Sequence, residues 1–210
     1  ANGELQSRTL NAATTHYEYD ALGMLQAVTL EDGREIEYVT DGIGRRVAKR
    51  VDGEPVQGFL YQDTLNPVAE LDADGEIASL FMYATHDNVP DVMLSKKEDG
   101  QTWRAYRLFT DHVGSPVLII NVSDGSVAQE ITYDEFGLVL EDTNPGFQPF
   151  GFGGGMYDDQ TRLILFGTRN YDAEIGRWIS KDPWRFQGGD ANLYSYVLND
   201  PVNRRDPLGL

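Results

Sequence analysis

Three Asp-Pro pairs near the end of this 210-residue chain carry the residue types best suited to chemistry: Asp182-Pro183, Asp200-Pro201 and Asp206-Pro207. Two carboxylates that share one proton can act together, one taking a proton from water while the other polarises a carbonyl group. Proline fixes its own φ and lacks an N–H group, so it makes the local turn rigid and can hold a carboxylate in place. Asp-Pro is also a common way to start a turn. Spacing alone therefore leaves both a catalytic and a turn interpretation open.

Other chemistries find little support in the sequence. The chain has no Cys, which excludes disulfides, thiolate metal sites and cysteine nucleophiles. His16, His86 and His112 are far apart, so a histidine metal site is not expected. The glycine run at 150–155 lacks the Lys-Ser/Thr ending of a phosphate-binding loop. We therefore predict no cofactor and no metal.

The charge and hydropathy of the chain limit the kinds of partner that it can bind. The formal net charge of −17 repels phosphate backbones and anionic membrane surfaces, so no nucleic-acid or membrane partner is expected. No window approaches the roughly 18 apolar residues of a membrane helix, which favours a soluble protein. Residues 1–160 contain 10 basic and 28 acidic side chains, whereas 161–210 contain 7 and 6, so the C-terminal part differs from what precedes it. The sequence begins at Ala1, with neither Met nor the basic-then-apolar run of a signal peptide, which predicts an internal fragment or a processed product.

Two turn signals repeat along the first 140 residues. Asp-Gly pairs begin at Asp32, Asp52, Asp74, Asp99 and Asp124, at intervals of 20 to 25 residues. Asp-x-x-Gly segments begin at Asp20, Asp41, Asp111 and Asp134. Asp-Gly favours the two-residue type I′ hairpin, because both central residues need positive φ. The pattern predicts a long antiparallel meander with Asp-Gly turns on one rim and Asp-x-x-Gly turns on the other.

The C-terminal part breaks this rhythm. Asp190 can cap a short helix in which Leu193 pairs with Val197 and Tyr194 with Leu198, at i and i+4. A short helix among strands predicts a plug or cap.

The motifs together resemble those of the Rhs/YD-repeat proteins over nearly the whole chain. They are Tyr19-Asp20-Ala-Leu-Gly23, Asp111-His-Val-Gly-Ser-Pro116, Tyr133-Asp134-Glu-Phe-Gly137, Arg169-Asn-Tyr-Asp172, Gly176-Arg-Trp-Ile-Ser-Lys-Asp-Pro183, Asn192-Leu-Tyr-Ser-Tyr-Val197 and Asp206-Pro-Leu-Gly-Leu210. The resemblance implies an all-β fold, in which antiparallel β-hairpin repeats form part of a hollow β-shell. Residues 1–149 would be hairpin repeats of the shell wall, and 150–210 a repeat-associated core domain, an irregular plug with a short helix.

The resemblance also implies an activity. Such core domains close the shell and cut their own chain in the manner of an aspartic protease, just after the Asp-Pro-x-Gly-Leu motif. The cut here would follow Leu210, with Asp182 and Asp206 as the carboxylates. Arg169, in the Arg-Asn-Tyr-Asp motif, would be the third participant, holding one carboxylate ionised or supporting the oxyanion. Arg177 is the competitor for that role, and Asp200 is interpreted as a turn residue.

The implied partners are the remainder of the shell, a C-terminal toxin as encapsulated cargo, and a secretion-apparatus tip protein or chaperone. The implied location is outside the bacterial cell after type VI or Tc-type delivery, and cytoplasmic before it. Two other hypotheses stay open: a non-catalytic YD-repeat surface scaffold for adhesion or carbohydrate binding, and a free aspartic protease that acts in trans.

Overall fold

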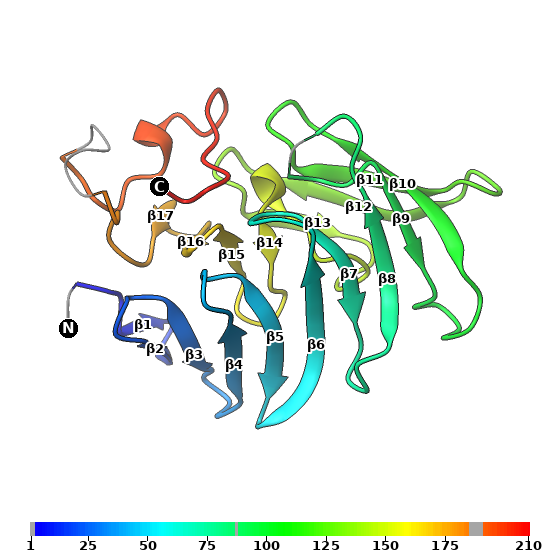
Figure 1. Ribbon diagram of the computed structural model, residues 1–210. Helices are drawn as coiled ribbons and strands as arrows, with labels where there is room; N and C mark the ends of the chain where they lie inside the picture. The colour runs from blue at the N-terminus through cyan, green and yellow to red at the C-terminus, as the bar shows by residue number, and fades with distance from the viewer. Residues whose placement is uncertain (1–2, 87, 185–190) are drawn as a thin grey trace.

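The computed structural model describes residues 3–86, 88–184 and 191–210, which form two antiparallel sheets (Figure 1). The wall sheet has 13 strands: β1 (Ser7–Leu10), β2 (Ala13–Tyr19), β3 (Leu25–Thr29), β4 (Glu35–Thr40), β5 (Arg46–Val51), β6 (Glu54–Tyr61), β7 (Pro67–Leu71), β8 (Ile77–Met82), β9 (Val92–Ser95), β10 (Arg104–Thr110), β11 (Pro116–Asn121), β12 (Val127–Tyr133) and β13 (Val139–Asp142). The small sheet has four: β14 (Met156–Tyr157), β15 (Leu163–Phe166), β16 (Arg169–Asp172) and β17 (Arg177–Trp178).

Each strand of the wall sheet pairs with its neighbour in sequence, so the sheet is an uninterrupted meander. Figure 1 shows it as a curved band running from β1 to β13. The all-β, antiparallel prediction is confirmed. In the described part of the chain, no helix is long and apolar enough to cross a membrane.

The two kinds of turn alternate as predicted from β2 to β6 and from β9 to β13, but the β6–β7 and β8–β9 connections contain neither. In the turn after β2, one carboxylate oxygen of Asp20 accepts hydrogen bonds from the backbone amides of Leu22 (2.8 Å) and Met24 (2.9 Å). The Asp-x-x-Gly turns at Asp41, Asp111 and Asp134 repeat this pattern. The aspartate therefore satisfies two turn amides that no strand partner reaches.

The type I′ prediction is right for one Asp-Gly pair and wrong for the others. Both Asp52 (φ 51°) and Gly53 (φ 83°) have positive φ, but at Asp32, Asp74, Asp99 and Asp124 only the glycine does. At Gly33 the amide bonds to the carbonyl three residues earlier, as it does in an Asp-x-x-Gly turn. The glycine alone satisfies the positive-φ requirement of such a longer turn, so the preceding aspartate stays in an ordinary conformation.

The small sheet and its flanking segments pack on one face of the wall sheet. Leu163 and Ile179 join a buried cluster with residues of β2 to β4, and Phe147 and Phe150 join one with residues of β8 to β11. The two sheets thus share their core, and the division of the chain at residue 150 stays a prediction.

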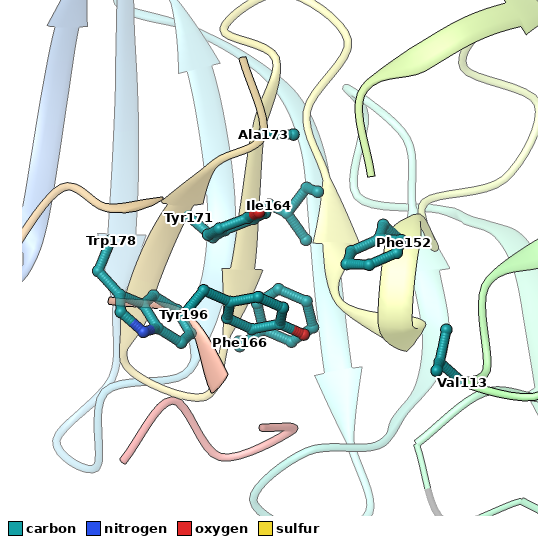
Figure 2. Packing of buried hydrophobic residues seen from close by; sticks show 8 residues of the cluster. All are labelled: Val113, Phe152, Ile164, Phe166, Tyr171, Ala173, Trp178 and Tyr196. Carbon is teal, nitrogen blue, oxygen red and sulfur yellow. The ribbon is translucent and has the colours of Figure 1, made fainter. Parts of the chain in front are cut away.

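A cluster of aromatic rings lies between the small sheet and the C-terminal segment (Figure 2). Tyr196 packs against Tyr171 (4.5 Å between ring centroids), Trp178 (5.4 Å) and Phe166 (5.7 Å). These distances are typical of favourable aromatic pairs. The cluster therefore anchors the C-terminal segment to β15, β16 and β17.

A buried polar cluster also joins the two layers. Asp158, which follows β14, accepts hydrogen bonds from Lys49 Nζ (2.9 Å) and Tyr38 Oη (2.9 Å) of the wall. The Arg46 guanidinium stacks on the Tyr38 ring at 3.6 Å and donates to Asn170 Oδ1 of β16. Burial raises the pKa of Asp158, but the charges of Lys49 and Arg46 outweigh it and the pKa falls below its ordinary value. The cluster therefore holds a carboxylate ionised inside the core.

The predicted helix is wrong. Its cap, Asp190, lies outside the described residues, and the part of the predicted span that the structure describes, residues 191–199, contains only a 3-10 turn at Val197–Asn199, with positive φ at all three residues. The residues before it form a turn instead: the Ser195 amide donates to the Asn192 carbonyl, and the Leu193 and Tyr194 carbonyls accept hydrogen bonds from the amides of Asp182 and Trp178, respectively. Backbone pairing with β17 therefore overrides the local helical pattern.

Candidate active site

The structure brings Arg169, Asp182 and Asp206 together, although 37 residues separate the first from the last. Arg169 begins β16, Asp182 follows β17, and Asp206 lies in the terminal segment, residues 200–210. Arg169 Nη2 lies 3.3 Å from Asp206 Oδ2 and 3.6 Å from Asp182 Oδ2. Both carboxylates thus face one guanidinium nitrogen.

The same groups hold one peptide unit of the terminal segment. Arg169 Nε donates to the Gly209 carbonyl oxygen (2.7 Å), and the Leu210 amide donates to Asp206 Oδ1 (3.2 Å). These two atoms belong to the Gly209–Leu210 peptide bond and point to opposite sides of it. Arg169 and Asp206 therefore hold this peptide unit from its two opposite edges, and we call this pair of contacts the clamp.

Arg169 is positioned by strand pairing and by a ring. It pairs with Phe166 across the two-residue hairpin between β15 and β16, and its guanidinium stacks at 4.0 Å over the Trp178 ring. The arginine is buried, and its burial lowers its pKa, although the charges of Asp182 and Asp206 oppose this. The cation is thus stabilised by a ring face and two carboxylates in place of water.

Asp182 is both a turn residue and a charged partner. Its Oδ1 accepts the Trp184 amide (2.7 Å), and its backbone amide donates to the Leu193 carbonyl (3.0 Å). Its other oxygen faces Arg169. One carboxylate oxygen of Asp182 therefore serves the turn, and the other is the one that faces the candidate site.

Burial raises the pKa of Asp206, and the neighbouring charge of Asp182 adds to the rise. The Leu210 and Gly209 amides and the Arg169 charge act in the opposite direction without cancelling it. A raised pKa on one carboxyl group beside a second carboxylate is typical of pairs that act in acid–base catalysis.

The site is open to solvent. A cavity of about 450 Å³ is lined by the three charged side chains and Leu210, and a second, of about 680 Å³, reaches Arg169 and Asp182 from the N-terminal part of the wall. The Asp182 and Asp206 side chains keep 15% and 18% of their surface exposed. Water can therefore reach both carboxylates.

The remaining candidates lie elsewhere. Arg177 is exposed on β17, so Arg169 and not its competitor faces the carboxylates. Asp200 lies in a turn and forms an exposed ion pair with Arg204 (3.8 Å). No group of three or more His or acidic residues suited to a metal occurs among residues 3–86, 88–184 and 191–210.

Sequence reasoning missed the role of Trp178 beside Arg169, because only tertiary contact reveals it. It also missed Gly167, whose backbone lies against the terminal segment. The only local signal was the position of Gly167 two residues before Arg169.

An antiparallel hairpin meander closed by a smaller sheet and a clamped terminal segment defines a wall segment of a YD-repeat shell. The family model described as the teneurin YD-shell matches residues 1–202. The chain belongs to this family.

Relatives come from animals and bacteria. Teneurin-1 of Gallus gallus is 35% identical over 200 residues, which cover 90% of this chain and 7% of that protein. The tRNA3(Ser)-specific nuclease WapA of Bacillus spizizenii is 29% identical over 201 residues, 92% of this chain and 8% of that protein. The chain thus spans less than a tenth of these relatives, in which the matching segment is part of a much larger protein.

Among solved structures, TcdB2-TccC3 without its hypervariable C-terminal region has a TM-score of 0.71 at 24% identity, over 93% of this chain and 10% of that one. TcdB2-TccC3-Cdc42 gives a TM-score of 0.72 at the same identity and coverage. These likenesses show the shared shell fold.

Proposed function

We propose that this chain is the segment of a toxin-encapsulating shell that cleaves its own polypeptide after Leu210, in cis and once. Asp182 and Asp206 would be the catalytic carboxylates and Arg169 their partner. The observation that carries the proposal is the clamp. Arg169 faces both carboxylates and holds the Gly209 carbonyl, and Asp206, one of these carboxylates, accepts the Leu210 amide.

The clamp supports a defined reaction. The Leu210 amide nitrogen and the carbonyl carbon of the bond to be cut are separated only by Cα, so the bond to Asp206 brings that carbonyl close to the pair. Asp182, acting as the base, takes a proton from water as the water oxygen bonds to the carbonyl carbon. Asp206, protonated, gives its proton to the carbonyl oxygen, which forms a tetrahedral diol.

Collapse of the diol completes the reaction. The carbon–nitrogen bond breaks, the leaving nitrogen takes the proton held by Asp182, and one diol hydroxyl returns a proton to Asp206. The products are a carboxyl group at Leu210 and a free amino group on the next residue. Arg169 lowers the cost of a negative charge on Asp182 and holds the preceding carbonyl, so it acts by charge and by position.

Cleavage here would free a C-terminal toxin inside the shell. The names of two relatives support a variable C-terminal activity: WapA is described as a nuclease, and TccC3 has a hypervariable C-terminal region. The rest of the shell and the toxin would be the partners of this segment, with a secretion-apparatus tip protein or chaperone at delivery. The assembly would leave the bacterial cell after cytoplasmic synthesis.

The test is the intact mass of the full-length protein with about fifty native residues or more beyond Leu210. We expect the wild-type chain to end at Leu210 and both Asp182→Asn and Asp206→Asn to stay uncut. Asp200→Asn is the matched control, because Asp200 is the third Asp-Pro aspartate and lies in an exposed turn; it should cleave normally. An uncut wild-type chain, or cleavage in both pair variants, contradicts the proposal.

A non-catalytic scaffold that binds carbohydrate is the second candidate. Exposed aromatic rings favour it: Trp103 and Trp184 keep 44% and 57% of their surface exposed, and sugars stack on such rings. It predicts an uncut wild-type chain and glycan binding that Trp103→Ala weakens.

A further inference from the structure

We infer that Gly167 and Gly209 form a backbone seat that fixes which peptide bond reaches the carboxylate pair. The inference rests on the proposed self-cleavage and adds the element that sets its position. A Cβ atom on Gly167 would lie 2.0 Å from the Leu208 carbonyl oxygen, and one on Gly209 would lie 2.3 Å from the Phe166 carbonyl oxygen. Both distances are far below any contact that a real Cβ makes, so only glycine fits at either position.

The contact is reciprocal. Gly167, in the β15–β16 hairpin, faces residue 208, and Gly209, in the terminal segment, faces residue 166. Both glycines have positive φ, +52° and +63°. No side chain separates the two backbones here, so main-chain atoms set how closely they approach each other.

The seat lies between the two halves of the clamp. Gly167 is two residues before Arg169, and Gly209 is the residue whose carbonyl Arg169 holds. A Cβ atom at either position pushes the terminal segment away from the hairpin. The same displacement lengthens the bond to Arg169 and moves the Leu210 carbonyl away from the carboxylates.

The apolar side chains beside the cut contribute little to holding the terminal segment. Leu208 and Leu210 keep 46% and 40% of their surface exposed, so neither is anchored by burial. The position of the cut should therefore depend on glycine at 209 and tolerate changes at 208. The structure thus assigns specificity to the backbone seat and not to a side-chain pocket.

The experiment compares Gly167→Ala with Gly33→Ala in the full-length protein. Gly33 also has positive φ (+87°), but a Cβ there meets nothing within 4 Å, so this control carries backbone strain without a clash. We expect Gly167→Ala to slow cleavage about 100-fold, the effect of a misplacement near 1 Å, and Gly33→Ala to cleave at the wild-type rate. Normal cleavage of Gly167→Ala overturns the inference.

A second pair of variants lies in the terminal segment, at two neighbouring positions of which only one belongs to the seat. Gly209→Ala should block cleavage, whereas Leu208→Ala should cleave normally. If Leu208→Ala blocks cleavage as strongly as Gly209→Ala, a side-chain pocket sets the position and the seat is refuted.

Hydrogen exchange separates failure of the seat from failure of the proposed function. In an uncut Asp182→Asn background, Gly167→Ala should speed exchange of the Gly209 and Leu210 amides, which donate to Asp206 in the intact seat. Unchanged exchange refutes the seat. Faster exchange in a protein whose wild-type form is never cut supports the seat and refutes only the self-cleavage.

Discussion

Asp158 provides the sharpest test of how the inner segment is held on the wall. Asp158→Asn removes a carboxylate that keeps only about 4% of its surface exposed, and it leaves the buried Lys49 ammonium without its main partner. Breaking a buried ion pair from one side costs about 3–5 kcal/mol. Since each 1.4 kcal/mol is a factor of ten, opening of this contact should become about 140- to 4,000-fold more frequent.

The assay is hydrogen exchange at the hairpin that Asp158 begins. The Asp158 amide donates to the Leu163 carbonyl and the Arg162 amide to the Asp158 carbonyl, so both report opening of the β14–β15 connection. Exchange at these amides should accelerate by the factor above. It should stay unchanged in strands of the wall far from β5.

Asp159→Asn is the matched control. Asp159 is the next residue, carries the same charge and lies 4.0 Å from the same Lys49, but it is 49% exposed. Exposed pairs contribute about 0–1 kcal/mol, so its loss should change exchange by less than about fivefold. A double variant, Lys49→Met with Asp158→Leu, should recover part of the protection because it removes the Lys49 charge together with its partner, while Tyr38 Oη still loses its acceptor. Equal effects of Asp158→Asn and Asp159→Asn would refute the reasoning.

Three further predictions concern pH, the ring beside the arginine, and the turns. Because burial raises the pKa of Asp206, its acid form persists to higher pH than in the unfolded chain. The initial rate of precursor cleavage should therefore fall as pH rises through that raised pKa. The stability that the protonated side chain contributes to the folded state should be lost over the same pH window. Trp178→Leu should slow cleavage about 3- to 30-fold, because it removes a ring–cation contact with Arg169 of about 0.5–2 kcal/mol. In the same time course, Trp178→Phe should restore part of the rate and the control Trp184→Phe should leave the rate unchanged. Asp41→Ala removes the acceptor of two turn amides and should destabilise that hairpin by about 1 kcal/mol in exchange measurements, whereas Asp41→Asn keeps an oxygen in place and should cost less.

The meander was predictable from the sequence because its determinants are local. An aspartate and a glycine a few residues apart specify a turn, and the alternation of two turn types specifies a hairpin ribbon. The turn type was harder: Asp32 and Asp52 both precede glycine, but only Asp52 takes positive φ, since loop length depends on the register of both flanking strands.

The helix and the site show where local reasoning stops. Leu193 and Tyr194 have helical spacing to Val197 and Leu198, but their carbonyls accept amides from Asp182 and Trp178, which no window of sequence around 194 contains. The convergence of the three charged residues likewise came from motif resemblance and not from spacing. The close contact of Gly167 with the terminal segment depends on two backbones meeting in space, so it carries no sequence signature.

The unbroken strand order also has a consequence for the time course of synthesis. Each wall strand pairs with the strand made just before it, so the wall can extend one hairpin at a time as the ribosome delivers it. The inner segment contacts strands made up to 164 residues earlier, as in the pair of Arg8 on β1 with Asp172 on β16, and Arg169, Asp182 and Asp206 all come after β13. Translation therefore delivers the three charged residues of the candidate site only after all thirteen wall strands of this segment have been made.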